Sequence, residues 1–79
     1  MPRFYFHLFN DVDVPDCEGK ELADLAAARD YADRQARALM AAMIVEEGRL
    51  VLHHRIDIED EDHARIASVG FGDALVIER

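Results

Sequence analysis

The feature that most constrains how this chain can fold is a long alanine-rich segment, Asp24 to Glu47. Its apolar residues recur every three or four positions, which places them on one face of an α-helix. These residues are Leu25, Ala28, Ala32, Ala36, Leu39, Met40 and Met43. Because the alanine side chains are small, a sheet can approach this face closely. We therefore predict one long helix that packs on a sheet.

Local signals support both ends of this helix. Asp24 fits the N-cap, where its carboxylate accepts from a free amide of the first turn. Gly48 fits the left-handed position that follows many helices. Asp30–Arg34 and Asp33–Arg37 have the i,i+4 spacing of ion pairs, each of which supports a helix by about 0.2–0.5 kcal/mol.

The second half of the segment, Ala38 to Val45, is apolar around its whole circumference and should be buried on every side. A helix of this length spans about 36 Å, whereas the strands that the chain can supply reach about 23–30 Å. The last turns should therefore overhang the sheet and offer a surface for another chain. We assign this surface to Tyr31, Ala38, Met40, Ala41, Ala42, Ile44 and Val45, with Tyr5 and Phe9 as extensions. Two alternatives are a C-terminal segment that folds back over this end and a helix that stops earlier.

Strand-like alternation flanks the helix on both sides. Arg3 to Phe9 reads as a strand that returns through Val12 and Val14, and Arg49 to Glu59 alternates apolar and polar residues. His63 to Phe71 should return antiparallel. Its main apolar residues, Ile66 and Val69, are an odd number of positions apart and would face opposite sides of a regular strand, so we predict a bulge near Ser68–Gly70. The fold class is therefore α+β: two antiparallel β-hairpins flank one long helix on one face of the sheet, in the order ββαββ. We leave open a short C-terminal strand at Leu75-Val76-Ile77.

Length and charge limit the classes of function. The 79 residues form a single small domain, 1–79, near the size at which oligomerisation often supplies missing stability. The net charge of −8 disfavours direct binding to nucleic acid or to an anionic membrane. One cysteine, Cys17, allows no internal disulfide, and no signal peptide or transmembrane segment is evident. We expect a cytoplasmic protein.

The residues that could carry chemistry form no convincing site. His53 and His54 are adjacent and should point to opposite faces of a strand, although His7 and His54 could converge if their strands are neighbours. We expect His54 to be a packed or hydrogen-bonded residue, semi-buried with its polar atoms satisfied, rather than a metal ligand. Asp11, Asp13 and Asp16 lack the glycine and glutamate spacing of a calcium loop and read as a solvated turn. Ser68 and Cys17 have no recognisable catalytic partners. We predict no catalytic residues, no cofactor and no metal.

The chain also resembles a known family. Pro2-Arg3-Phe4-Tyr5-Phe6-His7-Leu8 is similar to the N-terminus of short bacterial proteins that share a domain of unknown function, as are Glu18-Gly19 with Glu21-Leu22, Asp24-Leu25 and Ala27-Ala28-Arg29. The acidic hairpin that ends at Phe71, with Asp73-Ala74, is similar too. The resemblance implies a free-standing cytoplasmic domain and no activity. A weaker similarity, in strand order alone, is to antitoxin domains of the HicB type.

Three functions follow as hypotheses. The first is a small non-catalytic interaction module that forms a homodimer or higher oligomer through the helix. The second is an antitoxin-like protein whose acidic edge binds a basic protein partner. The third, which these residues favour least, is a metal- or ligand-binding enzyme.

Overall fold

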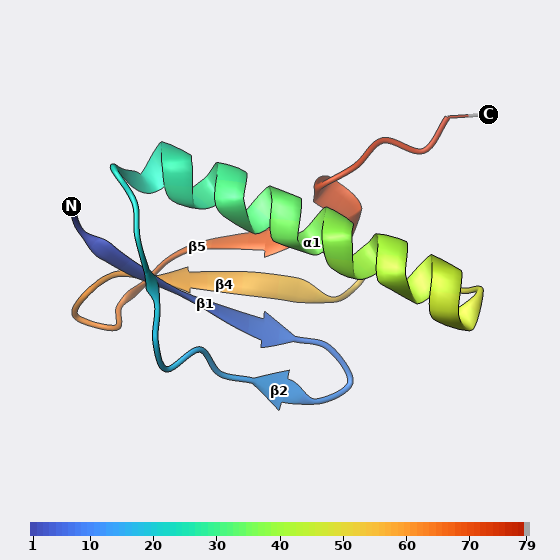
Figure 1. Ribbon diagram of the computed structural model, residues 1–79, viewed down its shortest axis with the longest axis horizontal. Helices are drawn as coiled ribbons and strands as arrows, with labels where there is room; N and C mark the ends of the chain where they lie inside the picture. Colours follow the sequence, from blue (N-terminus) through green and yellow to red (C-terminus); the bar gives the residue numbers. More distant parts are fainter. Residues whose placement is uncertain (79) are drawn as a thin grey trace.

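One helix lies on one face of an antiparallel five-stranded sheet in the computed structural model, which describes residues 1–78. The strands are β1 (Arg3–Phe9), β2 (Asp13–Val14), β3 (Lys20–Glu21), β4 (Arg55–Glu59) and β5 (Arg65–Gly70). Their order is β2-β1-β4-β5, and β3 also pairs with β1. Helix α1 (Leu25–Glu47) crosses this sheet, and a short 3₁₀ helix, η1 (Phe71–Asp73), follows β5 (Figure 1). The predicted α+β class is confirmed.

The helix begins and ends where the sequence signals place it. The Asp24 carboxylate accepts from the Ala27 amide at 2.9 Å. Gly48 has a φ of 65°, and its amide donates to the Ile44 carbonyl oxygen. A left-handed backbone is strained for residues that carry a Cβ, which explains the glycine.

Four residues at four-residue spacing form the buried face of α1: Ala28, Ala32, Ala36 and Met40. They pack mainly over β4 and β5, where Ile56, Ile58 and Val69 complete the core with Phe4 and Phe71. The three alanines have no exposed surface at all. This contact leaves no room for a longer side chain at their positions.

The ion pairs predicted on α1 divide into one that forms and one that is replaced. Arg34 Nε lies 3.0 Å from Asp30 Oδ2, as expected. Arg37 Nε instead donates to the Ala74 carbonyl oxygen at 2.6 Å, so it ties the helix to the chain after η1. The prediction of an Asp33–Arg37 pair was wrong because a buried backbone acceptor lies within reach of the guanidinium.

The predicted strand from Arg49 to Glu59 forms only over its second half, because β1 and β5 both end at its middle. Phe9, the last residue of β1, and Gly70, the last of β5, both pair with Arg55. A strand that extended before Arg55 would therefore lack neighbours. Instead, the carbonyl oxygens of Leu52 and His54 accept from the amides of Gly72 and Phe71, which holds this segment against η1.

Three smaller strand predictions also need correction. The irregularity in β5 lies opposite Ile58 and Glu59, where Ile66 is the extra residue, rather than at Ser68–Gly70. A bulge at Ile66 still explains why Ile66 and Val69 differ in parity. Lys20–Glu21 pairs with β1 as a strand that the sequence did not suggest. Among the described residues 75–78 no C-terminal strand forms.

The close helix–sheet contact gives a first prediction. Substitution Ala32→Leu should lower the free energy of unfolding by about 1–3 kcal/mol, because the added methylenes have no space between α1 and the sheet. Urea unfolding followed by circular dichroism measures the change.

Ala26→Leu is the matched control, since Ala26 is an exposed residue of the same helix and leucine is nearly as good a helix former as alanine. Equal stability of the two variants would show that α1 does not lie against the sheet in solution.

Candidate functional site

The last turns of α1 project beyond the sheet, as its length predicts (Figure 1). Ile44 is 51% exposed and Val45 is 84% exposed. Ala38, Ala41 and Ala42 are exposed as well. The segment after η1 leaves these side chains uncovered as far as Glu78, the last described residue. We call the seven helix residues assigned to self-association above the distal helix surface: Tyr31, Ala38, Met40, Ala41, Ala42, Ile44 and Val45.

Two members of the distal helix surface have other contacts. Met40 is a core residue with 2% of its surface exposed, so it supports the surface from below. The Tyr31 ring meets the Phe6 ring edge-on, with 4.7 Å between centroids, and Lys20 Nζ lies 5.1 Å from the Tyr31 centroid. Tyr31 therefore forms the boundary between the helix and the edge of the sheet.

Tyr5 and Phe9 do not extend the distal helix surface, because they lie on the sheet face that α1 leaves open. They alternate along β1 with Phe4, Phe6 and Leu8, which pack toward the core. The Tyr5 ring lies 4.5 Å from the His63 ring, and the Arg55 guanidinium lies 4.4 Å from the centroid of Phe9.

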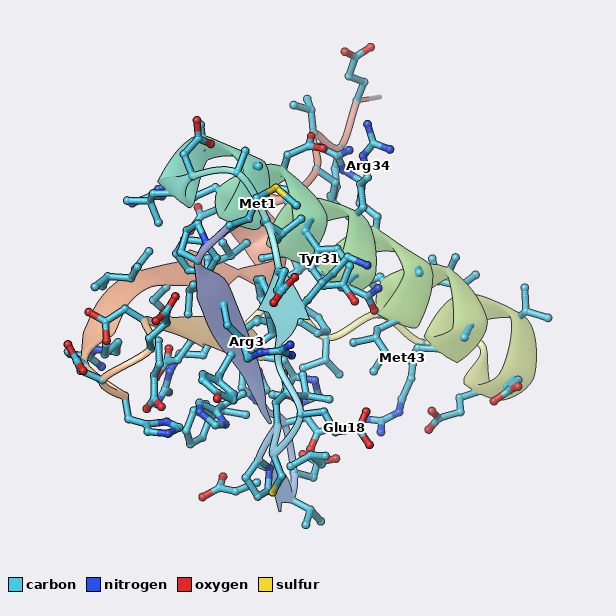
Figure 2. The ribbon with its side chains drawn as sticks, turned by 60° about the vertical axis from the view of Figure 1, so that its left-hand side comes forward. Met1, Arg3, Glu18, Tyr31, Arg34 and Met43 are labelled. Carbon is cyan, nitrogen blue, oxygen red and sulfur yellow. The ribbon has the colours of Figure 1, made fainter. Side chains whose placement is uncertain are left out.

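A groove runs between α1 and β1, on the side of the helix that faces the sheet. One part, of about 400 Å³, has a floor of Phe6, Leu8 and Ile56. A second part, of about 220 Å³, lies under the overhanging turns and is closed by Met43, His54 and Phe71. Leu8 and Leu39 line both parts, so the two parts adjoin at these side chains. Figure 2 shows Met43 beneath the helix and Arg34 on its opposite side.

The loop after β2 is held at the groove by one carboxylate, Asp16. Its Oδ1 accepts from the amides of Glu18 and Gly19, and its Oδ2 accepts from the amide of Phe6, each at 3.1 Å. Gly19 has a φ of 71°, and a Cβ there would lie 2.8 Å from the Phe4 carbonyl oxygen. Both the backbone conformation and this close approach require glycine.

Hydrogen bonds decide the protonation of Asp16. Partial burial acts to raise the pKa of this carboxyl, but the amides of Gly19, Phe6 and Glu18, together with His7, lower it below its ordinary value of 3.8. A carboxylate that accepts several amide hydrogen bonds favours its charged form. Asp16 is therefore an anion at neutral pH.

His7 connects this loop to β4. Its Nδ1 accepts from the Asp16 amide at 2.9 Å, so its Nε2 carries the hydrogen and donates to Glu59 Oε1 at 2.8 Å. Glu59 Oε1 also lies 3.3 Å from His63 Nδ1. The hydrogen bond from His7, with that from His63, lowers the pKa of Glu59.

His7 and His54 do not converge, whereas the rings of His53 and His54, which were predicted to point to opposite faces of a strand, meet edge-on before β4 with 4.9 Å between centroids. His7 lies on the open sheet face, whereas His54 is 3% exposed on the core side, with its ring 5.6 Å from that of Phe71. Neither ring nitrogen of His54 has a hydrogen-bond partner, and Asp11 Oδ1 lies 3.6 Å from Nε2, beyond hydrogen-bond distance. His54 is packed, as one of the two expectations had it, but the prediction that it is semi-buried with its polar atoms satisfied was wrong. Within residues 1–78 no three His, Cys, Asp or Glu side chains are grouped to hold a metal ion.

The acidic residues separate into distinct roles. Asp16 binds amides, Asp13 pairs with Phe9 in the sheet, and Asp11 lies 3.7 Å from Arg49. At the hairpin tip, Asp60 Oδ1 accepts from the amides of Asp62 and Ala64. Glu61 Oε1 accepts from the Arg3 amide at 2.9 Å. The carboxylates of Asp16, Asp60 and Glu61 therefore hold loop backbone in place.

Sequence reasoning did not identify the groove or the role of Asp16. The Asp16-Cys17-Glu18-Gly19 pattern, an aspartate followed by a glycine three residues later, was the one available signal for an Asx turn. The contact between His7 and Glu59 depends on the pairing of β1 with β4, which no local pattern reveals.

The Asp16 contacts give a pH-dependent prediction. Asp16→Asn should lower the free energy of unfolding at pH 7 by about 1–3 kcal/mol. The asparagine NH2 group would replace one accepting oxygen and face a backbone N–H, so at least one hydrogen bond would be lost. The pKa of Asp16 is lower in the folded protein than its ordinary value of 3.8. The stability that the ionised carboxylate contributes is therefore fully present above pH 3.8, and it is lost as the pH falls through the lower pKa of the folded state. The difference from wild type in urea unfolding should therefore shrink in acid.

Asp13→Asn removes the same charge from an exposed residue of β2 and is the control. A constant difference between wild type and Asp16→Asn down to the most acidic pH would contradict this role for the carboxylate.

Comparisons with known proteins give one result. Searches of curated proteins and of solved structures find no match. A family model described as a domain of unknown function (DUF6894) matches residues 3–72, which include every strand, helix α1 and the groove. The resemblance identified from the opening strand and the helix is confirmed, and the chain belongs to the DUF6894 family.

Proposed function

We propose that this protein is a small non-catalytic interaction module that self-associates through the distal helix surface. The observation that carries the proposal is the exposure of Ile44 and Val45 on helical turns that lie beyond the sheet. Large apolar side chains gathered on one exposed surface commonly mark an interface. A second copy of the chain is the partner that this surface fits.

The outward face of α1 has the spacing of a helix–helix seam. Ala38 and Val45 are separated by seven residues, with Ala41 and Ala42 between them, and Tyr31, seven residues before Ala38, lies where this face borders the groove. A seven-residue apolar repeat keeps one face of a helix toward a partner helix. The small alanines permit a short distance between the two axes.

Charges favour an antiparallel arrangement of the two helices. If pairing is centred between Ala38 and Ala41, Arg34 of one copy lies opposite Val45 of the other and next to its Glu46. Opposite charges across an interface set register and orientation. A parallel arrangement would bring Glu46 and Glu47 of the two copies together.

A basic protein partner, as in an antitoxin-like role, has less support. Glu59, Asp60 and Glu61 of the acidic hairpin already accept hydrogen bonds within the chain. Binding a basic partner there would compete with these contacts. We keep this role as the alternative.

An enzymatic role has little support from the geometry. Ser68 Oγ donates to Asp57 Oδ1 at 2.8 Å, but Asp57 is also bound by Arg55 at 3.2 Å and lies 3.7 Å from Arg65. The two guanidiniums and the Ser68 hydroxyl place this carboxylate in an ion-pair and hydrogen-bond network. Networks of this kind usually stabilise a fold rather than perform proton transfer.

The proposed compartment is the cytoplasm. Among residues 1–78, no helix combines the length and the apolar character that crossing a bilayer requires. The single cysteine, Cys17, is exposed as a free thiol, which suits a reducing environment.

Charge placed in the seam tests self-association. Light scattering of the wild type should give at least twice the chain mass of 9.0 kDa. Val45→Lys should shift the mass toward the monomer and raise the dissociation constant at least about tenfold, since its ammonium would be desolvated in the interface opposite Arg34 of the other copy.

Ala26→Lys adds the same charge to an exposed residue of the first helical turn and should leave the mass unchanged. A wild type that stays monomeric over a hundredfold concentration range would refute the proposal, as would a Val45→Lys variant with wild-type mass.

A further inference from the structure

The buried imidazole of His54 closes the part of the groove that lies under the overhanging turns of α1. Both ring nitrogens lack a hydrogen-bond partner, although the ring is almost fully buried. A buried polar group without a partner is costly, and it indicates that a partner is missing from the site. We propose that this groove binds a small amphiphilic amine, with an alkylammonium head beside His54 and its apolar chain along Leu8 and Leu39.

The charges around His54 select a cation. Asp11, Glu46 and Glu47 contribute three carboxylates near this end of the groove, and Arg49 contributes one guanidinium. Arg49 Nε lies 3.0 Å from Glu47 Oε1, so that pair is neutral as a unit. The remaining negative charge repels a carboxylate ligand and attracts an ammonium.

The distance between His54 and Asp11 suits an ammonium that contacts both. Nε2 and Oδ1 are 3.6 Å apart, too far for a direct hydrogen bond. Because Nε2 itself is buried, the exposed Asp11 side chain must first turn aside; one ammonium nitrogen at about 2.9 Å from each atom can then donate to both of them. His54 then accepts through its unprotonated nitrogen, and Asp11 supplies the opposite charge.

The remainder of the groove matches an alkyl chain. From His54 the floor continues over Leu8, with Met43 and Leu39 on the helix side, toward Phe6 and Tyr31. These side chains are apolar or aromatic, although Asp16, Glu18, Lys20 and Gln35 also line the larger part, and the two parts of the groove have volumes of about 220 and 400 Å³. Small-molecule sites usually combine such apolar walls with a few polar groups at one end.

Hexylammonium is the probe for this site. Calorimetric titration of the full chain should give saturable binding at one site per chain, and the His54 ring protons should shift in NMR spectra more than those of His53. Hexanoate, which has the same chain and the opposite charge, should bind at least about tenfold more weakly, as should methylammonium, which lacks the chain.

Two variants separate the site from general attraction to an acidic protein. His54→Phe keeps a ring of similar size and should raise the dissociation constant at least about tenfold, whereas His63→Phe, at an exposed ring beside Tyr5 on the open sheet face, should leave it unchanged. Glu46→Gln leaves the core intact and should weaken binding about two- to fivefold, so it tests the site even if His54→Phe fails to fold.

Hexanoate binding as tight as that of hexylammonium would overturn the proposal. Undiminished binding to a folded His54→Phe variant, or to Glu46→Gln if that variant alone folds, would overturn it too, as would the absence of saturable binding to the wild type.

Discussion

The absence of side-chain bulk under helix α1 is the constraint on which the rest of this structure depends. Ala28, Ala32 and Ala36 have no exposed surface, so the helix backbone lies directly over the sheet. Its main contacts are with β4 and β5. The helix therefore does not cover all of β1, and Phe6 and Leu8 remain only partly buried beside it. The groove follows from this placement.

The length of α1 relative to the strands explains why two different surfaces meet at one end of the molecule. Beyond Met40 no helical residue is buried, yet the helix continues to Glu47. From Ala38 onward, the outer side of the helix presents Ala38, Ala41 and Val45, and its lower side presents Leu39 and Met43 to the groove. Ala42 belongs to both, so association of two chains and occupation of the groove should influence each other.

Local patterns predicted the elements that local interactions decide. Asp24 and Gly48 marked the ends of α1 because capping involves residues a few positions apart. The alternation of Arg49 to Glu59 was not sufficient, since a strand needs neighbours and both neighbours end at Arg55. The parity of Ile66 and Val69 revealed that a bulge exists, but its position depends on the register with β4.

The groove beside His54 was less predictable from the sequence, because what distinguishes it is that the ring nitrogens of His54 have no hydrogen-bond partner within the protein. A histidine within an apolar run normally finds a hydrogen-bond partner when it is buried, and nothing in the sequence distinguishes His54 from that case. An unpaired buried polar group costs about 1–3 kcal/mol, a substantial share of the roughly 5–15 kcal/mol by which a small domain is stable. Phenylalanine would fill the same space beside Phe71 without that cost. A role in binding accounts for a histidine there, whereas packing alone does not.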